Sequence, residues 1–158
     1  MQASLALPDA PPPAPAAAKM FSVYQVPTGC ITLMWPAVEP LLARAVAREH
    51  GRFTTRDILQ WLIHEEQQLW VITSGGRVWA AALMHVHRHP TGKRSATGHL
   101  MGGSRMRDWA GAFFSAWIAD CRLHGITEIR VVGRKGWTRV TRPFGFRPEA
   151  VILTREEA

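Results

Sequence analysis

The feature that most restricts the fold is a pair of β-forming segments joined by two glycines. Residues 69–73 and 77–89 are rich in apolar and β-forming side chains, and Gly75-Gly76 lies between them. Glycines tolerate the positive φ angles of the tight turns that join antiparallel strands. The pattern therefore predicts a β-hairpin, and the chain is expected to fold around a sheet that contains it.

Helical periodicity precedes the hairpin. Apolar residues within 41–46 recur at helical spacing, with Pro36 in the first turn of the predicted helix and Gly51 after its end. A second helix is expected to follow, because Thr54 or Thr55 can cap its first turn. The sequence thus predicts two helices before the hairpin.

Strands and helices alternate in the rest of the chain. The pattern predicts short strands within 21–33, a strand at 96–101, a strong helix at 110–124, a strand at 126–132, a short helix at 135–142 and a final strand at 146–154. Gly125 is placed to end the strong helix. This order indicates an α/β fold: a mixed, mostly antiparallel twisted sheet with helices on both faces.

The first nineteen residues differ in composition from the rest. Residues 1–19 are rich in proline and alanine, which predicts an extended arm, either a linker or a strap that orders against a neighbour in an assembly. Residues 20–158 are then expected to form one domain.

Composition excludes several classes of protein. Hydrophobic residues make up 47% of the 158 residues, which argues against disorder. We find neither an apolar run of the roughly 20 residues that span a membrane nor a secretion signal, so we expect neither membrane association nor secretion. Cys30 and Cys121 make no disulfide framework and are expected to be small core residues in a reducing compartment.

Three segments together resemble the GNAT acetyltransferase family. Residues 69–82 resemble its central hairpin, 123–131 the exit from its main helix into the next strand, and 143–146 its Gly-Phe element before a strand. The similarity covers about residues 21–155. It implies the GNAT fold and, in an active member, acetyl-CoA as the cofactor.

The loop that holds the cofactor's diphosphate in this family departs from the pattern here. Its Arg/Gln-x-x-Gly-x-Gly/Ala motif falls on 105–110, where Arg105 and Ala110 match, but Asp108 replaces the central glycine and Trp109 follows. A negative charge and a bulky ring are thus expected to occupy the place of the diphosphate. A carboxylate about 4 Å from a phosphate costs on the order of 4 kcal/mol, and its Cβ crowds the approach. We therefore expect no bound cofactor. In the acetyl-CoA alternative, the expected cradle is Gly102, Gly103 and Ser104 with Arg105 and Ala110.

The resemblance supplies few catalytic groups. The position of the family's frequent tyrosine acid falls on Thr141, and the strand at 96–101 has no glutamate, although His99 could act as a base. We therefore assign no catalytic residue, and the fold is expected to match the family better than the chemistry does.

His85, His87 and His89 alternate, so they share one face of a strand, and His99 may face them from the next strand. Such a group could bind zinc or nickel or give an interface pH sensitivity. We favour a polar strand end and predict no metal site.

Basic residues gather near the C-terminus in a protein of net charge +7. They suit the backbone of a nucleic acid or an acidic partner; the alternative is a solvated face with the tryptophan packed inward. The predicted interaction residues are Arg130, Arg134, Lys135, Trp137, Arg139, Arg142 and Arg147.

The leading functional hypothesis is a non-catalytic or weakly catalytic GNAT-fold protein that acts as a structural or binding component. Residues 107–109 and 134–137 also resemble small GNAT-like proteins encoded among the structural genes of tailed phages. That resemblance implies a virion component at the head–tail junction or inside the head, within an oligomeric assembly, found in the virion or the host cytoplasm. Its partners would be other virion proteins, contacted through the arm, or DNA. The alternatives are an acetyl-CoA-dependent N-acetyltransferase and a basic nucleic-acid-binding protein.

Overall fold

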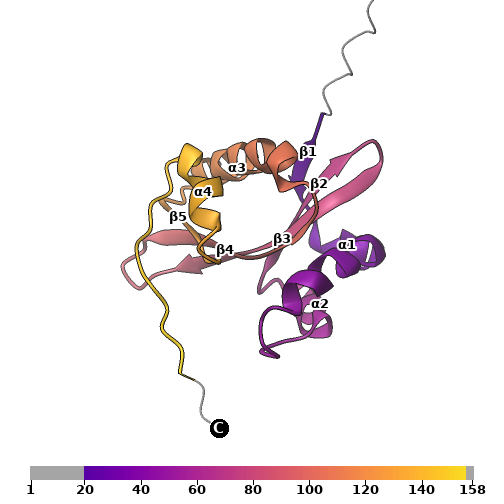
Figure 1. Ribbon diagram of the computed structural model, residues 1–158, viewed down its shortest axis with the longest axis horizontal. Coiled ribbons are helices and arrows are strands. Elements are labelled where there is room, and N and C mark those ends of the chain that lie inside the picture. The colour runs from indigo at the N-terminus through magenta and orange to yellow at the C-terminus, as the bar shows by residue number, and fades with distance from the viewer. Residues whose placement is uncertain (1–19, 156–158) are drawn as a thin grey trace, which may run out of the picture.

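The computed structural model describes residues 20–155 (Figure 1). The predicted arm at 1–19 lies outside the described residues, so its role stays a prediction. The elements are the strand β1 (Ser22–Gln25), the helices α1 (Ile31–Val46) and α2 (Thr55–Ile63), the strands β2 (Gln68–Ser74), β3 (Arg77–Arg88) and β4 (Arg94–Gly103), the helix α3 (Met106–Leu123), the strand β5 (Glu128–Val131) and the helix α4 (Trp137–Thr141).

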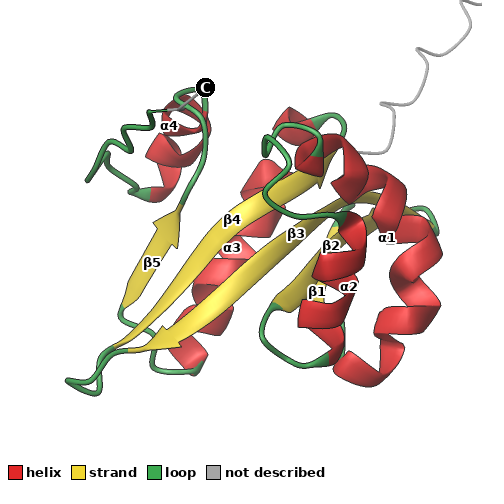
Figure 2. Cartoon of the chain, turned by 90° about the horizontal axis from the view of Figure 1, so that it is seen from below, coloured by secondary structure: helices red, strands yellow, loops and turns green. Residues whose placement is uncertain are grey.

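These strands form one sheet in the order β1-β2-β3-β4-β5. The first four strands pair antiparallel, and β5 pairs parallel to β4. Helices α1 and α2 cover one face, while α3 crosses the other (Figures 1 and 2). The predicted mixed α/β sheet with helices on both faces is confirmed. No helix within residues 20–155 is long and apolar enough to cross a membrane.

The predicted hairpin is the centre of this sheet. Gly75 and Gly76 take φ values of +58° and +71°, so the turn uses the conformation that glycine allows. Leu69 and Val71 pack against α1 and α2, whereas Trp70 and Ile72 pack against α3. Since both faces are covered, the strand is apolar at successive positions rather than at alternate ones.

Helix α2 begins where its capping residue predicts. The Thr54 backbone N–H donates to Asp57 Oδ2 over 2.7 Å, and the Asp57 N–H donates to Thr54 Oγ1 over 3.3 Å. This capping box satisfies two N–H groups that the first turn leaves free. Of the two candidate caps, Thr54 is therefore the correct one, and Thr55 instead donates its hydroxyl proton to Glu39.

Helix α1 begins earlier than predicted. It includes Ile31, and Pro36 and Pro40 both lie inside it, so the expectation that Pro36 occupies the first turn is wrong. A proline inside a helix removes one backbone hydrogen bond. The buried side chains of Ile31, Val38 and Leu42 pack against the sheet, and that burial outweighs the lost hydrogen bonds.

The predicted final strand at 146–154 does not form. Residues 146–155 have no regular secondary structure, and Val151, Ile152 and Leu153 are 83%, 77% and 90% exposed. A segment of high β-propensity becomes a strand only beside a partner backbone. Within the described residues, β5 has β4 as its only neighbour in the sheet.

Candidate functional site

A cleft of about 540 Å³ opens where β4 and β5 separate. The two strands pair only from Ser95 with Glu128 to Gly98 with Val131. Beyond Gly98, β4 continues beside β3. The chain that follows β5 turns away from β4 and leads to α4 (Figure 2). The cleft therefore lies at the point where a parallel pair ends, between β4, α3 and the loop after β5.

One wall of the cleft is aromatic. Trp109, Phe113, Phe114 and Trp117 from α3 line it, and all four are buried. Gly98 lets these rings approach the sheet, because a Cβ there would lie 2.9 Å from Met84 Sδ and 3.2 Å from the Trp117 ring. This wall provides a dry, apolar surface beside a polar rim.

The two glycines at the end of β4 have a packing role in the structure. A Cβ on Gly102 would lie 2.0 Å from the carbonyl oxygen of Leu41 in α1, and one on Gly103 would lie 2.6 Å from that of Trp79 in β3. Glycine at both positions lets the backbone of β4 approach the backbones of α1 and β3 closely. Gly102 and Gly103 line the cleft, whereas Ala110 lies on the buried face of α3.

Arg105, at the N-terminus of α3, pairs with the acid in the first turn of that helix, Asp108. Arg105 has a φ of +56°, a conformation that is uncommon for residues other than glycine. Its guanidinium lies 2.7 Å from Asp108 Oδ2, and its carbonyl accepts the Asp108 N–H. Because the carboxylate is already paired with a cation, it repels an approaching phosphate less than an isolated carboxylate would.

Trp109 does not project from this loop. Its side chain is 1% exposed, and its Nε1–H donates to the Ser104 carbonyl over 2.7 Å. The ring meets Phe113 edge to face, with 6.3 Å between centroids. The ring therefore packs in the core and forms part of the cleft wall instead of projecting into solvent. The sequence alone does not predict this burial, because a tryptophan next to an acidic residue can face either the core or the solvent.

His99 is the residue that sequence reasoning undervalued. The register shifts between Leu83 and Met84, which pair with Leu100 and Gly98, so His99 is the extra residue of a β-bulge. Its half-buried side chain lines the cleft. Burial lowers the pKa of His99 below its ordinary value, His85 acts in the same direction, and Glu49 opposes both. The imidazole is therefore neutral at neutral pH and able to accept a proton.

The residue at the position of the family's tyrosine acid lies away from the cleft. Thr141 is buried, and its hydroxyl donates to the Trp137 carbonyl inside α4 over 2.9 Å. Tyr24 lies on β1, at the edge of the sheet opposite β5. Neither hydroxyl lines the cleft.

The alternating histidines at the end of β3 make local contacts. His85 Nδ1 lies 3.0 Å from the Glu66 carbonyl oxygen, and His89 Nε2 lies 3.0 Å from Ser95 Oγ. The His87 and His89 rings contact each other at 4.5 Å. Within residues 20–155, no group of three or more His, Cys, Asp or Glu side chains is arranged to hold a metal ion.

The predicted basic residues lie along β5, α4 and the chain beyond it. The indole of Trp137 packs inward against Gly133, where a Cβ would lie 2.4 Å from its ring. Arg130 contacts Glu128 at 3.7 Å and Glu149 at 3.4 Å. The other cationic side chains lie exposed around them, at Arg134, Lys135, Arg139, Arg142 and Arg147. Of all these residues, Arg134 and Trp137 reach the cleft.

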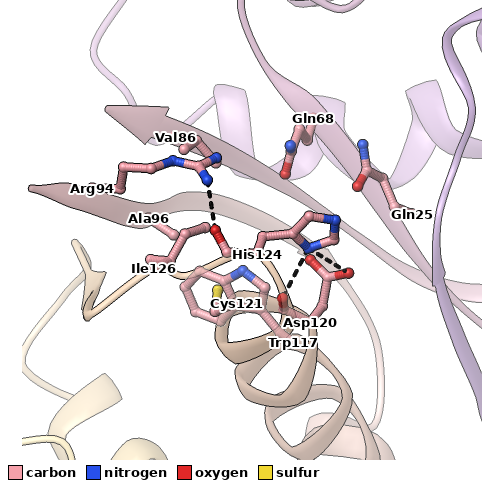
Figure 3. Close-up of a pocket in the computed structure, with 10 residues that line it drawn as sticks. All are labelled: Gln25, Gln68, Val86, Arg94, Ala96, Trp117, Asp120, Cys121, His124 and Ile126. Carbon is pink, nitrogen blue, oxygen red and sulfur yellow. Dashed lines mark hydrogen bonds and ion pairs between the residues drawn. The ribbon is translucent and has the colours of Figure 1, made fainter. Parts of the chain in front are cut away.

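A second, smaller cavity of about 70 Å³ lies at the other end of α3 (Figure 3). Burial raises the pKa of its Cys121 thiol to about 11, so the thiol stays protonated and packs as a small apolar group. His124 and Asp120 contact each other at 3.3 Å beside it. Cys121 is thus a core residue as predicted, whereas Cys30 is exposed and that part of the expectation is wrong.

No protein-family model and no curated protein sequence matches this chain. Several solved protein structures do match it in fold, at low sequence identity. A probable acetyltransferase superposes with a TM-score of 0.67 at 13% identity, over 87% of this chain and 99% of that one. A predicted acetyltransferase from Clostridium acetobutylicum, crystallised with acetyl-CoA, gives 0.62 at 18% identity, over 87% and 96%. The ribosomal-protein-alanine N-acetyltransferase from Brucella melitensis gives 0.64 at 10% identity, over 87% and 100%.

These matches span nearly the full length of each solved chain, and they agree with the five-stranded sheet and the placement of its helices. The protein has the fold of the GNAT acetyltransferases.

Proposed function

We propose that this protein binds acetyl-CoA and transfers the acetyl group to an amine. The observation that carries the proposal is the cleft between β4 and β5, which is lined by the bulged His99 and by Met106 at the N-terminus of α3. Support comes from the acetyltransferases of the same fold, one of them solved with acetyl-CoA. The sequence-based preference for a non-catalytic component becomes the second candidate.

The cleft suits the cofactor in two respects. The Asp108 carboxylate is paired with Arg105, and the Trp109 ring faces the core, so the two obstacles inferred from sequence are both reduced. The residues that would hold the diphosphate are Ser104 and Arg105, with the first backbone N–H groups of α3. The aromatic wall would exclude water from the reacting groups.

His99 would serve as the general base. Acetyl-CoA, when bound, supplies an acetyl thioester that an uncharged amine can attack. The neutral imidazole of His99 accepts the proton that the amine loses as its nitrogen bonds to the acetyl carbon, and CoA would leave as the thiolate when the carbon–sulfur bond breaks. Glu49, which raises the pKa of His99, would stabilise the resulting imidazolium.

Calorimetric titration with acetyl-CoA tests the binding step. We expect the unmodified protein to bind, and Asp108→Gly to bind at least about tenfold more tightly, because Arg105 is freed for the diphosphate. Asp120→Gly makes the same change near the other end of α3 and serves as the control, with unchanged affinity. If neither the unmodified protein nor folded Asp108→Gly binds, acetyl transfer is excluded.

The catalytic step is tested by His99→Ala. We expect kcat/KM to fall about 10²- to 10⁴-fold with acetyl-CoA affinity retained. In the unmodified protein, activity should decline only at pH values below the ordinary imidazole pKa of 6.5, since the pKa of His99 is lowered. A pH profile that His99→Ala leaves unchanged would remove this role.

The departures at Asp108 and Thr141 favour the second candidate, a non-catalytic structural or binding component. In that reading the partners would be virion proteins of a tailed phage, reached through the arm, or DNA reached through the basic residues. Binding of acetyl-CoA by Asp108→Gly but not by the unmodified protein would support it. DNA affinity that falls steeply with salt would support the nucleic-acid reading, and a flat salt response would exclude it.

A further inference from the structure

We infer that the amine which accepts the acetyl group is a small molecule that also carries a carboxylate, and that Arg48 and Arg134 bind this carboxylate at the cleft. The inference rests on the proposed acetyl transfer and adds the chemical class of the acceptor to it. The acidic group would lie a few bonds from the amine nitrogen.

The cleft extends through the sheet from one face to the other. Its aromatic wall belongs to α3, whereas Ala45 and Phe53, which also line it, belong to the core under α1 and α2 on the opposite face (Figure 2). Met106, at the N-terminus of α3, lines the cleft where the diphosphate would bind. An acceptor that enters while the cofactor is bound therefore needs the part of the cleft beside α1 and α2.

The turn between α1 and α2 forms the border of that part of the cleft. The chain reverses at His50 and Gly51, which take φ values of +53° and +75°, and residues on both sides of the turn line the cleft. The Glu49 carboxylate lies within electrostatic range of His99, since it raises the pKa of that imidazole. An amine that enters beside this turn can therefore reach the proposed base.

The charge at this part of the cleft is positive. Three arginines line the cleft, Arg48, Arg52 and Arg134, against the single acid Glu49. Arg52 pairs with Glu49 at 3.6 Å. Within residues 20–155, no carboxylate pairs with Arg48 or Arg134, and both side chains are exposed. Two guanidinium groups, one from α1 and one from the loop after β5, are thus available to an anion.

This arrangement favours an acidic amine over a neutral or a basic one. A guanidinium group donates two parallel hydrogen bonds to a carboxylate, so each arginine suits an acidic group in geometry as well as in charge. A diamine would instead place its second ammonium near Arg48 and Arg134, which repel it. Glu49 attracts that ammonium little, because its charge is already paired with Arg52.

The test compares three amines with the same number of carbon atoms as acceptors: butylamine, γ-aminobutyrate and putrescine. The full chain is assayed with acetyl-CoA by the release of the CoA thiol, and shorter and longer homologues of each amine cover the distance between carboxylate and nitrogen. At the best chain length, we expect kcat/KM for the amino acid to exceed that for the alkylamine at least about tenfold. The diamine should be the poorest acceptor.

Substitutions assign the preference to the two arginines. Arg48→Gln and Arg134→Gln should each lower the ratio of kcat/KM for the amino acid to that for the alkylamine about tenfold, because each loses a charge-assisted hydrogen bond. Arg44→Gln is the matched control: Arg44 is an exposed arginine of α1 that does not line the cleft, so the ratio should stay the same.

Saturation-transfer NMR without cofactor measures binding of the same amines directly. The amino acid should bind, and Arg48→Gln and Arg134→Gln should weaken that binding. A protein that binds acetyl-CoA but uses the three amines equally, or prefers the diamine, overturns this inference and leaves the proposed acetyl transfer in place. Binding of the amino acid that neither arginine variant weakens, or that Arg44→Gln weakens equally, overturns it as well. Absence of acetyl-CoA binding in the calorimetric titration overturns the proposed function, and the acceptor with it.

Discussion

The hairpin of β2 and β3 and the segment after α4 have similar β-propensity but opposite outcomes. In the hairpin, Leu69, Val71, Ala81 and Leu83 have no exposed surface, because helices cover both faces. In the segment, Val151 and Leu153 are 83% and 90% exposed and form no strand. The difference shows that propensity becomes structure only where a neighbouring backbone and a covering layer exist.

The largest expected effect compares one truncation in each region. Leu83→Ala should lower the free energy of unfolding by about 2–5 kcal/mol, because it leaves a cavity in a closed core. Ile152→Ala should change it by about 0.5 kcal/mol or less, because the side chain is 77% exposed. Urea denaturation of dilute protein measures both. Similar decreases in the free energy of unfolding at the two positions would contradict this difference between the regions.

The second comparison uses glycines. Gly102→Ala should destabilise the fold by about 1–3 kcal/mol, because its Cβ would meet the Leu41 carbonyl oxygen at 2.0 Å. Gly136, before α4, has helical backbone angles and no atom within 4 Å of an added Cβ. Gly136→Ala should therefore be neutral or stabilise by about 0.4–1 kcal/mol. Thermal unfolding distinguishes the two signs.

The smallest expected effect lies at the start of α2. Thr54→Ala removes the cap and should cost about 1 kcal/mol of unfolding free energy. Hydrogen bonds from Thr54 lower the pKa of Asp57 below its ordinary value of 3.8. Its stabilisation is thus complete above that value and is lost as the pH falls through the lowered pKa. The pH dependence of stability in acid should be smaller in Thr54→Ala, and an unchanged profile would contradict the capping box.

Local signals predicted the elements that depend on local chemistry. The glycine pair predicted the hairpin turn, and the two candidate caps Thr54 and Thr55 predicted the start of α2, where Thr54 is the cap. Gly125, with a φ of +65°, ends α3 as expected. These cases succeeded because the interactions that decide them join residues a few positions apart.

The candidate site was less predictable because distant segments form it. The bulge that presents His99 exists only in the pairing of β3 with β4. The inward turn of Trp109 depends on the space between α3 and the sheet, and the ion pair of Arg105 with Asp108 depends on a left-handed backbone at Arg105.

The sequence by itself determined the order of elements from β1 to α4, the central hairpin and the region of the α2 cap, since turn geometry and hydrophobic period act within short windows of chain. Only the tertiary structure decided where β4 and β5 part to form the cleft, which way the residues of 105–110 face, and that 146–154 lacks a strand partner among the described residues. Each of these depends on which backbones become neighbours in space, and no short window of the chain contains that information.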